Sequence, residues 1–256
     1  MIPKIIHYCW FGSAPYSSTI KKCIESWATI NPDYTIKFWN ESNVPIHDFA
    51  FMKDAYSFGK YAFVSDYARY MILKQEGGFF LDTDVESLKK FDNLLNNQFI
   101  CGFERNVKKD LFLVNPGLLL ACQPEHPLID KVLNFYDQVK LVDAKGEFDL
   151  RYTSPNVLTL LLKKEYGLNP NNQLQILNNG VCIYPSNYFS PINPRRIFNK
   201  FESLTDAYTI HYGEGSWINQ NTIVRTKISI IIRLLLGDKL VDFVKNKFNF
   251  SSFHEL

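Results

Sequence analysis

The chain has 256 residues, of which 46% are hydrophobic and 21% are charged, which is ordinary for a folded globular protein. Its net charge of +2 creates no strong field for a polyanion, so nucleic acid is not an expected partner. The 5 cysteines are scattered and form no C-x-x-C pair, which argues against a disulfide framework. The first residues are too mixed for a signal-peptide core, and we expect a cytoplasmic protein.

The first part of the chain is predicted to form a strand, a helix and a second strand. Residues 4–10 are typical of a buried strand, and residues 34–39 of another. Between them, apolar residues recur at helical spacing behind a capping serine at 17 or 18: Ile20, Cys23, Ile24 and Trp27. A strand–helix–strand unit of this length connects parallel strands.

The middle of the chain continues the alternation of helices and strands. Residues 60–76 predict a helix that the glycine pair at 77–78 closes. Further strands are expected at 79–81, 99–103, 115–121, 181–184 and 208–212, and further helices at 127–139 and 154–164. We therefore expect an α/β fold with a Rossmann-like, mostly parallel central sheet and flanking helices.

The C-terminal segment differs from the rest of the chain. Residues 221–256 are expected to form amphipathic helices with an excess of basic side chains, beyond a first domain at residues 1–220. Their apolar runs are shorter than the roughly 20 residues that a spanning helix needs. Two interpretations stay open: a helix lying on an anionic membrane surface, which we prefer, or a helical hairpin packed on the first domain.

Two aspartates, Asp82 and Asp84, directly follow the strand at 79–81. Side chains two residues apart on a strand point the same way, so these carboxylates are expected to converge on one Mg²⁺ or Mn²⁺ ion. Such a cation neutralises the charge that develops on a diphosphate leaving group. By itself a D-x-D pair is a weak motif, but this context favours a nucleotide-sugar transferase.

Three segments in matching order, residues 2–12, 65–84 and 211–217, resemble the signature segments of glycosyltransferase family 32. That family includes bacterial capsule and exopolysaccharide sugar transferases, and the catalytic domains of large glucosylating toxins share its elements. The resemblance extends over residues 1–220. It implies a GT-A fold, a divalent metal, a nucleotide-sugar donor and retention of the anomeric configuration.

The resemblance and the residue chemistry together suggest donor-site roles. Trp10 follows the first strand and is expected to stack on the donor base, against the alternative of a rim or core tryptophan. Asp66 and Arg69 share a helix face. Asp66 is expected to accept ribose hydroxyls and Arg69 to bind phosphate or fix the aspartates, against a plain ion pair on a solvated helix. Asp82 would reach the ribose, donor sugar or metal, and Asp84 the metal.

The late segment supplies further candidates. A pair of carboxylates cannot fill six coordination positions, so a third side chain is needed. His211 and Glu214 are both candidates for that ligand, and the choice between them stays open. Ser216 and Trp217 are expected to bind the β-phosphate and close over the donor.

Two segments carry weaker signals. Asn115 resembles the Asn-x-Gly segment near the donor sugar and is expected to bind a sugar hydroxyl. Ser154 opens a predicted helix in a segment similar to the family's Thr-Gly-Pro, so it either faces the donor or only caps the helix. Glu104 and Arg105 are interpreted as a solvated turn rather than as acceptor-side groups.

Two positions near the motifs have a different interpretation. His7 is expected to be a core histidine rather than a ligand. Phe80 stands where the toxin domains have a tyrosine, so their donor specificity is not expected to transfer.

The sequence thus predicts a retaining, metal-dependent hexosyltransferase that uses a nucleotide sugar, UDP-linked rather than GDP-linked, and a glycan acceptor. Its catalytic residues would be Asp82, Asp84, Arg69 and Asn115, with Mn²⁺ or Mg²⁺ as cofactor. A role in capsule or exopolysaccharide synthesis is expected. A membrane-bound tail would place the protein at the inner membrane face with a lipid-linked acceptor. A nucleotide-sugar-binding pseudoenzyme and a membrane-surface scaffold are the alternatives.

Overall fold

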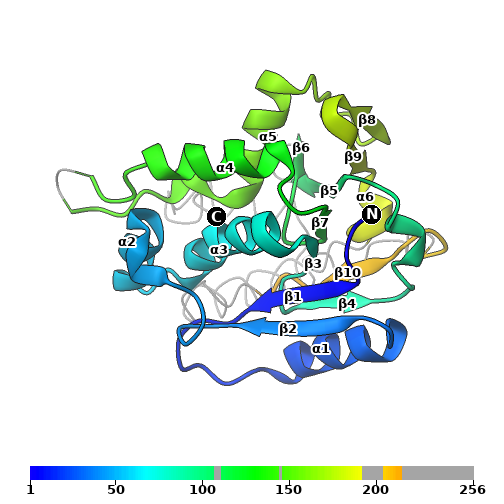
Figure 1. Ribbon diagram of the computed structural model, residues 1–256, viewed down its shortest axis with the longest axis horizontal. Helices are drawn as coiled ribbons and strands as arrows, with labels where there is room; N and C mark the ends of the chain where they lie inside the picture. Colours follow the sequence, from blue (N-terminus) through cyan, green and yellow to red (C-terminus); the bar gives the residue numbers. More distant parts are fainter. Residues whose placement is uncertain (107–110, 144–145, 192–203, 215–256) are drawn as a thin grey trace, which may run out of the picture. The chain divides into compact units, whose positions relative to one another are not determined.

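The computed structural model describes residues 1–106, 111–143, 146–191 and 204–214 (Figure 1). Residues 1–213 form one compact unit, and residues 214–256 are assigned to a second. The predicted tail at 221–256 lies outside the described residues, so its helices and the boundary at 220 stay predictions. None of the helices among the described residues has the length and apolar character to cross a bilayer.

The larger sheet has eight strands in the order β2-β1-β3-β7-β5-β9-β8, with β6 paired to β5. Strands β1, β2, β3, β5 and β9 run in one direction, and β6, β7 and β8 run in the opposite one. The bounds are β1 Ile5–Cys9, β2 Thr35–Trp39, β3 Gly78–Phe80, β5 Phe99–Asn106, β6 Leu111–Val114, β7 Leu120–Cys122, β8 Gln175–Leu177 and β9 Val181–Tyr184. The prediction of an α/β fold with a mostly parallel central sheet is confirmed.

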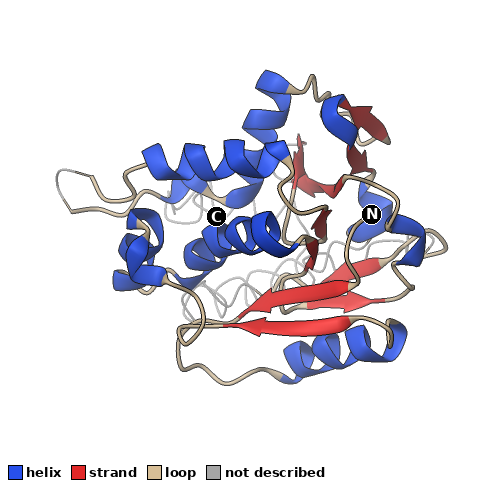
Figure 2. Cartoon of the chain, viewed as in Figure 1, coloured by secondary structure: helices blue, strands red, loops and turns tan. Residues whose placement is uncertain are grey.

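A small antiparallel sheet pairs β4 (Val85–Ser87) with β10 (Thr209–His211). The helices, which Figure 2 shows packed around the strands, are α1 Ser18–Ile30, α2 Ala50–Ser57, α3 Tyr61–Glu76, α4 Pro127–Gln138, α5 Ser154–Glu165 and the short α6 Ser186–Phe189. Strands β4, β6 and β8 and helices α2 and α6 were not predicted. The strand expected over 115–121 begins only at Leu120, because residues 116–118 form a turn.

The two faces of the large sheet bury separate hydrophobic clusters. Neighbouring residues of a strand point to opposite faces, and Phe79 and Phe80 accordingly join different clusters. The Phe80 face packs against α2, α3, α4 and α5, and the Phe79 face against Trp27 of α1 and Phe189 of α6. In Figure 1, α1 and α3 accordingly lie on opposite sides of β1. The sheet is therefore covered on both faces, and its strand ends remain as the place for a site.

The glycine pair brings α3 and β3 close to the rest of the sheet. Gly77 ends α3 with a φ of 63°, and its N–H donates to Leu73 O. A Cβ on Gly78 would lie 2.8 Å from Ile5 O, inside contact distance. His7 is fully buried here and lies with Nε2 2.9 Å from Gly77 O, while Nδ1 accepts from Trp39. The interpretation of His7 as a core histidine is confirmed.

Candidate active site

The carboxyl ends of the parallel strands β1, β2 and β3 meet at one edge of the sheet. Trp10 comes directly after β1, and its N–H donates to Trp39 O at the end of β2 (3.0 Å). The half-buried indole donates from Nε1 to Ala14 O (2.8 Å) and packs edge-on against Tyr16, with ring centroids 5.0 Å apart. Trp10 thus lies where open α/β sheets bind ligands, and its role in base stacking stays a prediction.

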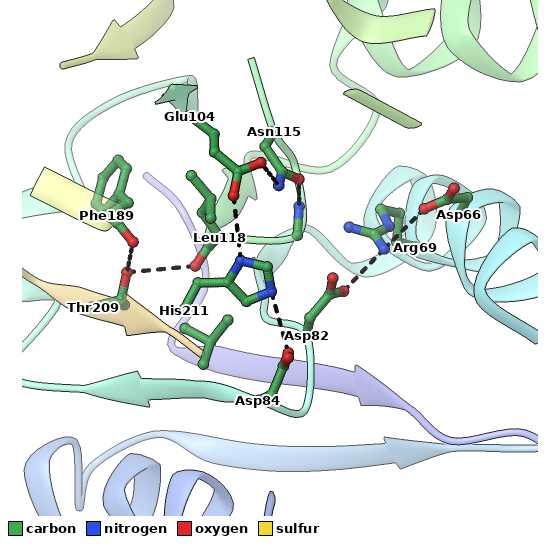
Figure 3. Close-up of polar contacts among 12 residues, drawn as sticks. Asp66, Arg69, Asp82, Asp84, Glu104, Asn115, Leu118, Phe189, Thr209 and His211 are labelled. Carbon is green, nitrogen blue, oxygen red and sulfur yellow. Dashed lines mark hydrogen bonds and ion pairs between the residues drawn. The ribbon is translucent and has the colours of Figure 1, made fainter. Parts of the chain in front are cut away.

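Asp82 and Asp84 lie in a tight turn between β3 and β4, not on a strand, because Val85 N–H donates back to Asp82 O (3.1 Å). The strand geometry from which we predicted their convergence is therefore wrong. Their carboxylates contact different partners, as Figure 3 shows: Asp82 contacts Arg69, and Asp84 contacts His211. The turn presents two acidic groups that are held separately.

Arg69 is buried between two carboxylates. Its Nη2 lies 3.0 Å from Asp66 Oδ1 and 3.0 Å from Asp82 Oδ1. The guanidinium also lies over the ring of Phe80, with Cζ 4.9 Å from the ring centroid. Only 3% of the arginine is exposed, so this is not the solvated helix pair that the sequence left open. Nε and Nη1 are buried without a hydrogen-bond partner among the described residues.

Asp66 links α3 to the start of α5. Its Oδ2 accepts a hydrogen bond from Ser154 N–H (3.1 Å), and the Ser154 hydroxyl lies 3.0 Å from the Tyr70 hydroxyl. Burial raises the pKa of Asp66 to about 6, although the nearby Arg69 charge lowers it. The first N–H of α5 is thus satisfied by a carboxylate of the protein itself. Donor-binding roles for Asp66 and Ser154 stay predictions.

His211 ends β10 beside the aspartate turn. The Thr209 hydroxyl donates to Phe189 O (3.1 Å), and Tyr212 N–H donates to Asp84 O (3.0 Å), so the strand is fixed on both sides of the histidine. Its Nε2 lies 3.3 Å from Asp84 Oδ1 (Figure 3). Burial lowers the pKa of His211, but the neighbouring carboxylates overcome this effect and raise it well above its ordinary value.

Glu104 and Asn115 connect His211 to the aspartate turn. Asn115 donates from Nδ2 to Glu104 Oε2 (2.8 Å), and its Oδ1 accepts from Gly117 N–H (2.8 Å). Gly117 O accepts in turn from Asp82 N–H (3.1 Å). Glu104 Oε1 lies 3.7 Å from Nδ1 of His211. The interpretation of Glu104 as part of a solvated turn is wrong, because it lies on β5 inside this network.

Gly117 allows the close packing at this point. A Cβ there would lie 2.2 Å from Asp82 Oδ2, a distance at which one of the two groups has to move. The Asn-x-Gly segment therefore brings the backbone against the carboxylate of Asp82. Asn115 lies next to the aspartate turn, and its contact with a sugar hydroxyl stays a prediction.

The side chains at the aspartate turn are of the kinds that bind a hard divalent cation. No group of three or more metal-ligating side chains lies ready-made in the part of the chain that the structure describes. Asp84 and His211 do lie within 3.3 Å of each other, and carboxylate and imidazole are both ligands for Mn²⁺. Glu214 follows three residues after His211 and stays the other candidate. Ser216 and Trp217 lie outside the described residues.

Comparisons with known proteins point to one class of enzyme. Residues 17–100 match the family model of a glycosyltransferase sugar-binding region containing a DXD motif. An uncharacterised glycosyltransferase of Acanthamoeba polyphaga mimivirus is 26% identical over 230 residues, which is 85% of this chain and 84% of the relative. A toxin of Photorhabdus asymbiotica is 28% identical over 202 residues, but these span 64% of this chain and only 7% of the toxin.

Solved structures give weaker likenesses. The PaToxG glycosyltransferase has a TM-score of 0.49 and 21% identity, over 64% of this chain and 70% of its own. The galactosyltransferase LgtC, in complex with donor and acceptor sugar analogues, has a TM-score of 0.47 and 14% identity, over 87% and 92%. Because both scores lie below 0.5, the fold rests on the strands and helices described above.

The matched family region contains Arg69, Asp82 and Asp84, which lie together at the aspartate turn. The chain is a glycosyltransferase with a DXD-type sugar-binding region.

Proposed function

We propose that this chain is a retaining, metal-dependent glycosyltransferase of the GT-A type, which transfers a hexose from a UDP-sugar to a glycan acceptor. The observation that supports it most is the contact between His211 and Asp84, at 3.3 Å. This contact joins the late sequence segment to the DXD turn, at the carboxyl edge of the sheet. Two segments that resemble one family's signatures thus meet at one place.

The contacts give each charged residue a different task. A divalent cation held by Asp84 and His211 would neutralise the charge that develops on the diphosphate leaving group. Arg69 already donates to Asp66 and Asp82 and is buried, so its contacts favour the role of fixing the aspartates over that of binding phosphate. Asp82 keeps a third of its side chain exposed and would receive ribose or donor-sugar hydroxyls.

Retention is assigned to attack on the same face from which the diphosphate leaves. In this step the acceptor oxygen forms the new bond to the anomeric carbon while the bond to phosphate breaks. The acceptor proton passes to an oxygen of the leaving diphosphate. A glycosyl-enzyme adduct trapped in mass spectrometry would contradict this step, because it would show a nucleophile on the protein.

The donor and acceptor classes come from the family resemblance. A panel of UDP- and GDP-sugars, incubated with the protein and Mn²⁺, tests the donor by slow hydrolysis to the free nucleotide. We expect hydrolysis of at least one UDP-sugar and none of the GDP-sugars. Binding of a UDP-sugar without hydrolysis or transfer would support a pseudoenzyme instead.

We further propose a role in capsule or exopolysaccharide synthesis, with a lipid-linked acceptor at the inner face of the membrane. The excess of basic residues in 221–256 supports the membrane contact, because basic segments are attracted to anionic lipid. Co-sedimentation with anionic liposomes, for the full chain and for a chain ending at residue 220, tests this proposal. Equal pelleting of the two forms would remove the membrane contact.

A further inference from the structure

The carboxylate of Glu104 has no role in the proposed reaction, although it lies beside the proposed metal ligands. Its Oε2 accepts the amide N–H of Asn115 at 2.8 Å, and Asn115 is itself 8% exposed and held by Gly117 N–H. Its Oε1 faces Nδ1 of His211 at 3.7 Å (Figure 3). One side of the carboxylate is thus fixed by a buried amide, and the other faces the imidazole ring.

The ring of His211 lies between two carboxylates. Nε2 faces Asp84 and Nδ1 faces Glu104. The backbone on which the ring stands is fixed by Thr209, whose hydroxyl donates to Phe189 O and Leu118 O. The 3.7 Å separation is longer than a hydrogen bond, and contacts of this kind tighten when a site is filled.

A metal-binding imidazole uses one ring nitrogen as ligand and donates its other N–H to an acceptor, most often a carboxylate or carbonyl. We infer that Glu104 is a positioning residue, which accepts the Nδ1–H of His211 and so leaves Nε2 aimed at the cation beside Asp84. This inference rests on the proposed function. Through Asn115 and Gly117, the same carboxylate connects the ring to the backbone of Asp82.

The tautomer of His211 tests the inference without metal or donor. Nitrogen NMR spectra of ¹⁵N-histidine-labelled protein are recorded at a pH where the ring is neutral. In the wild type both tautomers have a carboxylate to accept their N–H, Asp84 at Nε2 (3.3 Å) and Glu104 at Nδ1 (3.7 Å), so we expect a measurable population of the Nδ1–H form. In Glu104→Ala we expect the Nε2–H tautomer, because Asp84 is then the carboxylate that faces the ring. Equal populations of the two tautomers in the wild type and in Glu104→Ala would overturn the inference.

Mn²⁺ binding in the absence of donor, followed by electron paramagnetic resonance, gives the second readout. Loss of an outer carboxylate of this kind weakens metal binding by about 10–100-fold. We expect that loss in Glu104→Ala and a smaller one in Glu104→Gln, whose single carbonyl oxygen can still accept the Nδ1–H of His211. The matched control is Glu86→Ala on β4, because Glu86 accepts from the Tyr212 hydroxyl near the same strand pair.

A double variant distinguishes a positioning role of Glu104 from a general effect of its negative charge on the cation. If Glu104 acts through the ring, Glu104→Ala causes no further loss of Mn²⁺ affinity in a His211→Ala background. Additive losses, or equal losses in Glu104→Ala and Glu86→Ala, would overturn the inference in favour of a direct or general charge effect. A wild type that binds no Mn²⁺ would contradict the proposed function instead, and the NMR tautomer would still decide the role of Glu104.

Discussion

The two aspartates of the turn are held in two different ways. Asp82 contacts a buried arginine, which it shares with Asp66; Asp66 and Arg69 belong to α3, and Asp82 follows β3, the next strand along the chain. Asp84 contacts His211, which arrives on β10 from a distant part of the chain. Arginine keeps its charge at any physiological pH, whereas a histidine exchanges its proton for a metal. The arginine side is therefore a permanent support, and the histidine side is the part that a cation can change.

The arginine side is expected to show the larger effect on stability. Arg69→Met leaves two carboxylates facing each other without a cation, and breaking a buried pair in this way costs about 3–5 kcal/mol. Urea denaturation at pH 7 measures the change in the free energy of unfolding. In the matched control Arg151→Met, the exposed pair with Asp149 is lost, and we expect little change in stability. Equal effects of the two substitutions would contradict the description of Arg69 as a buried support.

The pH dependence of stability tests the arginine side further, through the pKa of Asp66. Burial raises the pKa of Asp66 to about 6, so the folded state holds this proton more tightly than the unfolded state. That stabilisation is complete below pH ~4 and is lost as the pH rises through about 6. Over this range we expect the free energy of unfolding of the wild type to fall by roughly 3 kcal/mol relative to that of Asp66→Asn. If the stabilities of the two proteins, measured by urea denaturation, change with pH in the same way, the raised pKa of Asp66 is contradicted.

The histidine side is expected to act on metal binding. His211→Ala removes the imidazole beside Asp84, and we expect Mn²⁺ affinity to fall by about 100-fold or more, beyond the loss typical of an outer residue. Calorimetric titration with Mn²⁺ measures it. The control is His47→Ala, an exposed histidine in the turn before α2. Unchanged affinity in His211→Ala would leave Glu214 as the third ligand.

Gly117 lies where the two sides meet. Gly117→Ala places a methyl group 2.2 Å from Asp82 Oδ2, and relief of such overpacking costs about 1–3 kcal/mol. We expect donor hydrolysis to fall as well, since Asp82 has to move. In an Asp82→Ala background the same substitution is expected to cost much less, because the oxygen that it meets is gone. An equal cost in both backgrounds would show that Asp82 is not the neighbour that matters.

The sequence predicted best what depends on neighbouring residues. Helix α1 begins behind Ser17, whose hydroxyl accepts from Ile20 N–H, and α3 ends at Gly77, because caps and apolar spacing are local signals. The contact between Asp66 and Arg69 was likewise visible at a spacing of three residues on one helix face.

Contacts that depend on tertiary structure were not predictable in this way. Strands β4 and β10 have three residues each, and their antiparallel pairing joins distant segments without any local pattern. Glu104 therefore looked like a turn residue, although β5 carries it to His211. The Asp82–Asp84 turn was misread as a strand end, although aspartate is typical of turns.

Donor hydrolysis by Asp84→Ala tests the central claim most directly. The assay compares the wild type, Asp84→Ala and the control Asp130→Ala, whose carboxylate makes an exposed ion pair with Lys74, for Mn²⁺-dependent release of UDP from UDP-sugars. Loss of a metal ligand removes several kcal/mol of charge stabilisation, so we expect about a thousandfold slower release in Asp84→Ala and unchanged release in the control. Release by Asp84→Ala at the wild-type rate, with the same dependence on Mn²⁺, would contradict the account.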